Sequence, residues 1–201
     1  MHHQKDLNME RLPARVLEDE DLRRLLAHVG SSRRPLRNRT MIMLSFKAGL
    51  RACEMSGLTW PMVLKTNGTI DDQIRISKHI AKKGSGRTIP LHPDLGRCLA
   101  AYHRQLEQPK QGPVILSERN GRMTPSSIAN WFSTVYAALS LRGCSSHSGR
   151  RTFITKTARA IGKVGGSLRD VQELAGHRSL TTTERYIEGD RDAQRKLVGM
   201  I

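Results

Sequence analysis

Four short stretches of the sequence carry cationic, imidazole and phenol side chains of the kinds that act on phosphate esters. They are GLRACE with Arg51 and Glu54, KKGSGR with Lys83, HSGRR with His147 and Arg150, and AGHRSLTTTERY with His177 and Tyr186. Guanidinium groups bind phosphate oxygens in bidentate fashion, an imidazole can take up a proton, and an activated phenol can act as a nucleophile. Each stretch alone is weak evidence. Tyr186 alone could be a packing residue, a hydrogen-bond donor or a nucleophile, and a packing role is the commonest of these.

The composition points to a polyanionic partner. The chain has 201 residues, with 34 Lys and Arg against 18 Asp and Glu, and a formal net charge of +16. Half of that charge would keep a protein of this size soluble, so a merely solvating surface is the weaker interpretation. Nucleic acid is therefore the expected partner.

Cysteine usage and hydropathy argue against several other classes of protein. Cys53, Cys98 and Cys144 are widely spaced and form no zinc-binding pattern, so we expect free thiols in a reducing compartment. No carboxylate cluster of metal-binding type is evident, and we expect neither a metal nor another cofactor. The N-terminus resembles no secretory signal, and the apolar run at 41–44 is too short to span a membrane. We therefore expect a cytoplasmic protein, nucleoid-associated if bacterial, with no membrane partner.

Helical periodicity runs through most of the chain and must position the reactive side chains. Gly49 is expected to close a buried helix, Thr124 and Ser167 to cap two later ones, and residues 31–39 to form a basic loop. The expected helices cover 16–30, 40–49, a short segment starting near 50, 93–108, 124–139, 150–162, 167–175, and one or two short segments within 181–201.

Residues 69–91 have a different character. Segments 69–77, 78–81 and 87–91 resemble short strands, and KKGSG at 82–86 resembles a turn between two of them. Residues 1–15 are polar and unpatterned, and we expect a flexible arm there. The remainder, 16–201, is expected to be one α+β domain, mainly helical, with a small antiparallel three-stranded sheet.

Taken together and in this order, the four stretches resemble the catalytic domain of the tyrosine recombinases, the phage-integrase family of site-specific DNA recombinases. The resemblance covers about residue 16 to the end. The family's G-x-R-x-x-E motif is matched by Gly49, Arg51 and Glu54, its hairpin lysine by Lys83 in preference to Lys82, its H-x-x-R by His147 and Arg150, and its G-H with TT-x-x-Y by Gly176, His177, Thr182, Thr183 and Tyr186.

The resemblance implies the fold, a DNA breaking-rejoining core, and a metal-free transfer of a phosphodiester. Tyr186 would attack the phosphorus to give a covalent 3′-phosphotyrosine and a free 5′-hydroxyl, with the bond energy retained. Two guanidiniums would stabilise the charge around the pentavalent phosphorus. The implied roles are phosphate binding for Arg51, Arg150 and His177, proton removal from the nucleophile by His147, and protonation of the departing 5′-oxygen by Lys83.

Several nearby residues have less specific expectations. Glu54 would either orient His147 or an arginine, or serve as a plain salt-bridge partner. Further contacts with DNA are expected from Lys82, Arg87, Arg151 and Arg178.

The chain departs from the family in its length. Most members carry an N-terminal helical domain that clamps the other face of the DNA, and residues 1–15 are too short to supply one. We expect either an excised catalytic fragment or a short member without the clamp, and the native-looking start MHHQKDLNM favours the short form.

Assembly and activity leave alternatives open. We expect a monomer in solution and a tetramer on paired DNA sites, with an accessory DNA-bending protein as a candidate partner. The apolar end, Leu197, Val198, Met200 and Ile201, could dock on a neighbouring protomer or on its own core. A site-specific recombinase of integrase or invertase type is favoured over a type IB topoisomerase by the short chain and the TTERY context. It is favoured over a catalytically silent DNA-binding module by the complete set of reactive residues.

Overall fold

The computed structural model describes residues 13–81, 84–186, 195 and 198–199. Helices dominate these residues, as the apolar periodicity predicted. They are α1 (Asp19–Gly30), α2 (Pro35–Lys47), α3 (Ala52–Gly57), α4 (Pro93–Gln105), α5 (Pro125–Ala138), α6 (Ser148–Ala160), α7 (Leu168–Ala175) and α8 (Leu180–Glu184), with 3-10 turns at Trp60–Met62 and Ile161–Val164. The predicted arm, as far as residue 12, and most of the predicted apolar end lie outside the described residues, as do Lys82 and Lys83.

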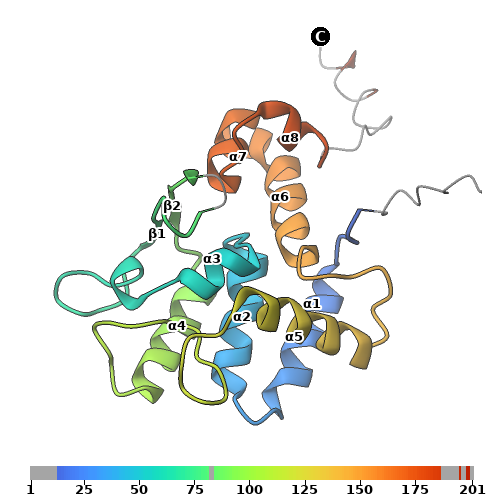
Figure 1. The fold of residues 1–201 in the computed structure, drawn as a ribbon. Helices are drawn as coiled ribbons and strands as arrows, with labels where there is room; N and C mark the ends of the chain where they lie inside the picture. The colour runs from blue at the N-terminus through green and yellow to red at the C-terminus, as the bar shows by residue number, and fades with distance from the viewer. Residues whose placement is uncertain (1–12, 82–83, 187–194, 196–197, 200–201) are drawn as a thin grey trace, which may run out of the picture.

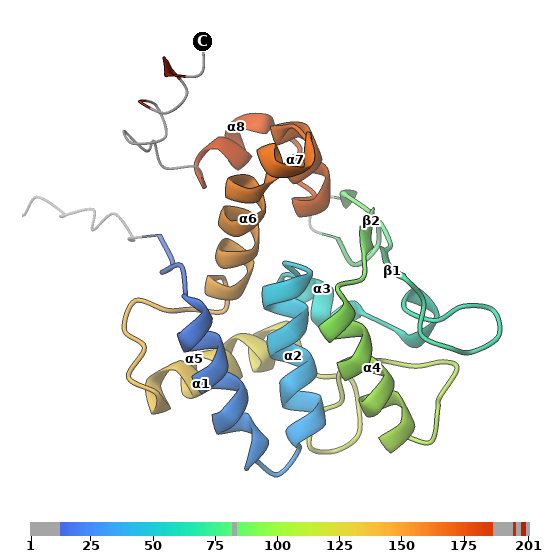
Figure 2. The same cartoon turned by 180° about the vertical axis from the view of Figure 1, so that it is seen from behind.

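Helix α2 lies at the centre of the larger part of the molecule. Figure 1 and Figure 2 show it between α1 and α4, with α6 rising from it toward α7 and α8. Its side chains Met41, Ile42 and Leu44 are fully buried, which explains why this segment is apolar on nearly every face. A second, smaller buried cluster of Ile154, Val171 and Ala175 joins α6 to α7. The upper part of the fold is thus held by few apolar residues.

Within the described residues the sheet has two strands, so the prediction of three strands was wrong. Strand β1 (Gln73–Ile76) pairs antiparallel with β2 (Arg87–Pro90), and Ile74 faces Ile89 in the register. The expected middle strand, 78–81, instead turns back on itself, because the backbone N–H groups of Ile80 and Ala81 both donate to the Ser77 carbonyl. Those donors are therefore not available to a β-ladder.

The basic loop predicted at 31–39 was also wrong in part. Helix α2 begins at Pro35, a residue suited to the first helical position because its ring fixes φ and it lacks an N–H. Arg37 is buried in the first turn, where it donates to the Leu116 carbonyl and contacts Glu118. From the sequence alone Arg37 resembles an exposed loop residue. The Leu116 carbonyl that accepts from it lies 79 positions along the chain and meets it only in the folded chain.

Two glycines allow helix α6 to approach the core closely. A Cβ atom at Gly149 would lie 2.3 Å from Ser45 Oγ and 2.7 Å from the Phe46 ring, so only glycine fits between α6 and α2. Gly49 adopts φ +62° after α2, and a Cβ there would lie 2.5 Å from the Phe153 ring. These contacts fix the start of α6 against the segment that leads into α3.

Helix caps follow the predicted pattern. The Thr124 hydroxyl accepts from the Ser127 N–H at 3.1 Å, and Ser167 and Asp170 cap the start of α7. No helix in the described part of the chain is long and apolar enough to cross a membrane.

Candidate active site

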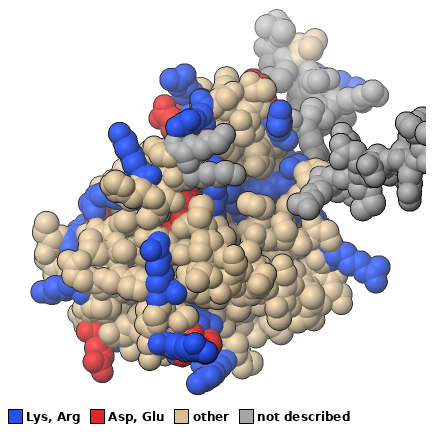
Figure 3. Space-filling view, in the orientation of Figure 1, with Lys and Arg blue, Asp and Glu red and all other residues tan. Residues whose placement is uncertain are grey.

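Five of the predicted reactive residues lie at element ends that meet in space. Arg51 directly precedes α3, and His147 directly precedes α6, whose first turn carries Arg150. His177 follows the C-terminal glycine of α7, and Tyr186 follows α8. Figure 3 shows lysine and arginine surface on the floor of a hollow beneath these upper helices, beside a small acidic area. Lys83 lies outside the described residues.

Arg150 is the most enclosed of these cations, with 3% of its surface exposed. Its Nη1 donates to the Gly49 carbonyl at 2.7 Å, and its Nη2 donates to the Ala175 carbonyl at 2.7 Å. Burial and the nearby Arg51 charge lower its pKa to about 10. The group therefore stays cationic at neutral pH, in a position fixed by two backbone carbonyls.

Glu54 is fully buried and binds two arginines. Its Oε1 accepts from Arg51 Nη1 and from Arg87 Nη1, each at 2.8 Å. Its Oε2 accepts from the Arg51 backbone N–H at 2.9 Å and from Arg87 Nη2 at 3.0 Å. Burial alone would raise the pKa of this carboxyl, but Arg87 and Arg51 outweigh it and lower the pKa to about 2. Glu54 was predicted to contact an arginine, and in the structure it contacts two, Arg51 and Arg87.

His177 is a neutral imidazole in this arrangement. Arg150 Nη2 lies 2.9 Å from its Nε2, and a guanidinium can only donate, so Nε2 accepts. The other nitrogen, Nδ1, then carries the proton and donates to Thr183 Oγ1 at 3.0 Å. Burial, with the charges of Arg150 and Arg51, lowers the pKa of His177 to about 4. His177 is therefore uncharged at neutral pH.

Tyr186 packs between two of the other predicted residues. Its ring stacks on the His177 ring with centroids 5.5 Å apart, and the Arg151 guanidinium lies 5.4 Å from its centroid. Its backbone carbonyl accepts from Thr155 on α6 at 3.4 Å. Tyr186 is half-buried, and it packs against the smaller apolar cluster of α6 and α7 and not in the main core. It lines the same cavity as Arg150.

A cavity of about 500 Å³ opens at this place. Its lining includes predicted functional residues and also the first described residues of the chain. It is lined by Pro13, Ala14, Gly143, Ser145, His147, Arg150, Arg151 and Tyr186. A group bound in this cavity would touch the exposed His147, the buried Arg150 and the tyrosine together.

The remaining predicted DNA contacts divide by exposure. Arg178 is exposed and Arg151 is half-buried, so both are accessible to a ligand. The side chain of Arg87 is only 5% exposed, and its Nε donates to the Leu174 carbonyl at 2.8 Å. Sequence reasoning missed this position for Arg87, and it missed Thr183 as the partner of His177. No sequence signal identifies either pair, because the partners meet only in the folded chain.

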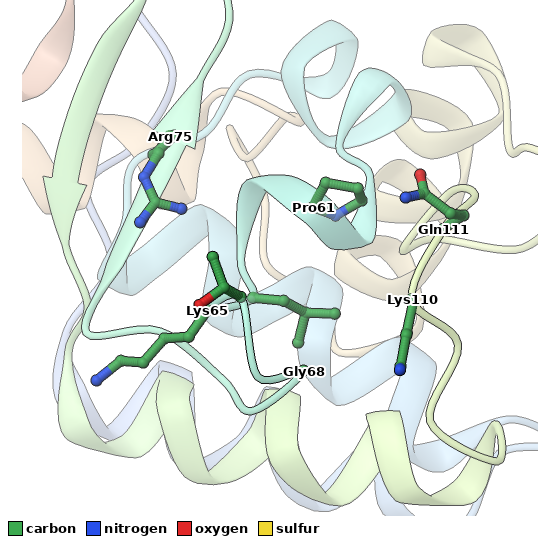
Figure 4. Close-up of a pocket in the computed structure, with 8 residues that line it drawn as sticks. Pro61, Lys65, Gly68, Arg75, Lys110 and Gln111 are labelled. Atoms are coloured by element: carbon green, nitrogen blue, oxygen red, sulfur yellow. The ribbon is translucent and has the colours of Figure 1, made fainter.

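A second cavity, of about 420 Å³, lies beside β1 and has a different character. Figure 4 shows Lys65, Arg75 and Lys110 at its edge, with their charged ends at separate places around it. Arg75 pairs with Asp71, and Lys65 Nζ lies 3.7 Å from Asp72. The cations here do not converge on one point. Among the described residues no group of three or more His, Cys, Asp or Glu could hold a metal ion.

Comparison with known proteins gives consistent results. A family model described as "Phage integrase family" matches residues 15–192. Tyrosine recombinase XerC of Myxococcus xanthus is 33% identical over 162 residues, which are 76% of this chain and 50% of the relative. The chain thus spans about half the length of the curated relatives it matches.

Solved structures share the fold at lower identity. The Tn1549 transposon integrase, in complex with transposon right end DNA, aligns with a TM-score of 0.75 at 16% identity over 97% of this chain and 68% of that one. XerA recombinase aligns with a TM-score of 0.68 at 20% identity over 92% of this chain and 62% of that one.

Proposed function

The chain belongs to the phage integrase family, and from that premise we propose that it cuts and rejoins DNA strands at specific sites through a covalent 3′-phosphotyrosine. The mainly helical fold with its small antiparallel sheet is that of tyrosine recombinase catalytic domains. One observation carries the proposal. The Tyr186 ring lies on His177, His177 is bonded to Arg150, and Tyr186, Arg150 and His147 line one cavity.

Arg150 and Arg51 would bind the scissile phosphate. Both guanidiniums are fixed by hydrogen bonds, Arg150 to two backbone carbonyls and Arg51 to Glu54. Little reorganisation is therefore needed when charge develops on the phosphate oxygens. A phosphate in the cavity would meet a fixed positive charge without a metal ion.

Tyr186 would be the nucleophile and His147 its base. The phenol oxygen forms the new bond to phosphorus while the bond from phosphorus to the 5′-oxygen breaks, and Lys83 supplies the proton for that leaving oxygen. His147 is exposed in the cavity that Tyr186 lines, where it can take the phenol proton.

His177 must change its hydrogen bonds to contact the phosphate. Its Nε2 accepts from Arg150, so it cannot at the same time donate to a phosphate oxygen. A phosphate oxygen of the substrate would replace His177 Nε2 as the acceptor of the hydrogen bond from Arg150 Nη2. The His177 ring would then turn or change tautomer. The neutral state of His177 makes that exchange a matter of hydrogen bonds alone.

Double-stranded DNA is the proposed substrate, supported by the charge of +16 and by relatives solved with DNA. Assembly as a tetramer on paired sites, with an accessory DNA-bending protein, extends the same proposal. So does action in the cytoplasm, on the nucleoid if the source is bacterial. Because several Lys and Arg would contact phosphates, affinity should fall steeply as salt rises.

The test is to trap the covalent intermediate. The protein is incubated with fragmented genomic DNA from its source, carrying nicks that let the short cleaved end diffuse away. Adducts that survive denaturation with wild type, and are absent with Tyr186→Phe, would support the proposal, and sequencing them gives the target site. Fragments that bind without forming adducts would favour a silent DNA-binding module. Relaxation of supercoils without strand exchange between sites would favour a topoisomerase.

A further inference from the structure

Arg87 contacts three parts of the candidate site from a position at the start of β2. Its Nη1 and Nη2 donate to the two Glu54 oxygens, and its Nε donates to the Leu174 carbonyl on α7. A Cβ atom at Gly176 would lie 2.9 Å from the Arg87 Cδ and Nη1 atoms. The side chain is thus enclosed between α3 and the turn that leads to His177.

The bidentate contact decides what Glu54 can offer to Arg51. Each carboxylate oxygen accepts one bond from Arg87, so Arg51 reaches Glu54 through its backbone N–H and through Nη1 only. A carboxylate without Arg87 would be free to take two parallel bonds from the Arg51 guanidinium, the geometry that such pairs favour. That pairing would turn the fork of Arg51 away from a phosphate and neutralise its charge.

Arg87 also holds the end of helix α7 next to Arg150. Leu174 and Ala175 carry successive carbonyls in the last turn, and they accept from Arg87 Nε and Arg150 Nη2 respectively. Cations are favoured there because the carbonyl end of a helix is negative. The turn at Gly176 and His177 is therefore anchored from the β2 side by Arg87.

We propose that Arg87 is a positioning residue that occupies Glu54 so that the Arg51 guanidinium stays directed at the scissile phosphate. This inference rests on the proposed function. It replaces the expectation that Arg87 contacts DNA, because a side chain 5% exposed and bonded through all three nitrogens has no face to offer to a backbone phosphate.

The test is a double-mutant cycle on single-turnover cleavage of a nicked copy of the DNA trapped by the wild-type protein. Arg87→Met should slow cleavage by about 10- to 100-fold, the usual effect of removing a group that orients a catalytic side chain. In a Glu54→Gln background the same change should cost less than about threefold, because the amide no longer captures Arg51. Affinity for a short fluorescent duplex of arbitrary sequence should change little in either background.

A matched control is Arg75→Met. Arg75 lies on β1 and also pairs with a buried carboxylate, but that carboxylate is Asp71 and not Glu54. It should leave cleavage unchanged. Arg87→Lys keeps the charge but not the fork, and it should restore the melting temperature without restoring full cleavage. All variants are compared at a temperature at which circular dichroism shows them folded.

Two results would overturn the inference. Equal losses of cleavage in both backgrounds would mean that Arg87 does not act through Glu54. A loss of duplex affinity as large as the loss of cleavage would make Arg87 a DNA contact after all.

A crystal structure of Arg87→Met judges the inference even if the wild-type protein cleaves nothing and the proposed function fails. Two Arg51 nitrogens on the Glu54 oxygens would support it. An Arg51 side chain left as in the wild type would refute it.

Discussion

Two glutamates in this molecule are each surrounded by arginines, yet they form different kinds of cluster. Glu54 is fully buried and binds Arg51 and Arg87 with four hydrogen bonds of 2.8–3.0 Å. The Glu118 side chain is 50% exposed and reaches three arginines, at 2.7 Å, 3.2 Å and 3.6 Å. These are Arg37, Arg34 and Arg33 respectively.

The two clusters differ in burial and not only in the number of cations. Around Glu54 water is excluded, so each guanidinium is fixed and its charge acts at full strength. Around Glu118 water screens the pairs, and the cluster mainly fastens the start of α2 to residues 116–120. Arginines that gather around a carboxylate can therefore form a buried cluster in the candidate site or an exposed clamp on the surface.

Removal of each carboxylate charge should give the largest difference between the two clusters. Glu54→Gln leaves two arginines without their buried counterion and should lower the free energy of unfolding by about 3–5 kcal/mol. Glu118→Gln should lower it by at most about 1 kcal/mol. Chemical denaturation measures both, and similar losses would show that the two clusters are energetically alike.

Arg37 is the one member of the Glu118 cluster that is itself buried, and it should have an intermediate effect. Arg37→Met leaves the Leu116 carbonyl and the Asn38 side chain without a donor, which should cost about 1–3 kcal/mol in the free energy of unfolding. Cleavage of DNA by the folded variant should be unchanged. Slower cleavage at unchanged stability would mean that this clamp belongs to the reactive centre.

Acid should destabilise the fold through His177, which is hydrogen-bonded to Arg150 beside the Glu54 cluster. Its folded-state pKa of about 4 lies below the ordinary 6.5, so the unfolded chain binds the proton first as the pH falls. The stability that His177 contributes is complete above about pH 6.5 and is lost between there and about pH 4. Melting curves over this range should show a decline in the wild type that His177→Asn reduces. Parallel declines would place the acid-sensitive group elsewhere.

Salt should separate the clusters by the smallest margin. Raising ionic strength shortens the screening length from about 10 Å at 0.1 M to about 3 Å at 1 M. The difference in unfolding free energy between wild type and Glu118→Gln should shrink by about a few tenths of a kcal/mol, while that for Glu54→Gln should hold. Denaturation at two salt concentrations measures both differences. An equal change in the two would contradict the exclusion of water from Glu54.

The sequence was a good guide to whatever depends on local pattern. Helix periodicity predicted the elements, and the order of motifs predicted that Arg51, Arg150, His177 and Tyr186 would lie together, as the structure shows. Their roles in catalysis stay predictions.

What the sequence could not show depends on contacts between distant segments. The strand expected at 78–81 has strand-like residues, but its backbone bonds to Ser77 instead. Arg87 and Glu54 are separated by 33 positions, so nothing in either neighbourhood indicates that they pair. Burial of Arg37 within a basic stretch depends likewise on the Leu116 carbonyl.

The close approach at Gly149 has a consequence for anyone who engineers this protein by mutagenesis. The space beside this glycine is filled by Ser45 and Phe46, and any added side chain would displace the first turn of α6, which carries Arg150. We therefore expect libraries that vary position 149 alone to return variants in which Arg150 is displaced, although residue 149 itself has no side chain to offer a ligand. Positions 45, 46 and 149 form one unit of design, to be held constant or varied jointly.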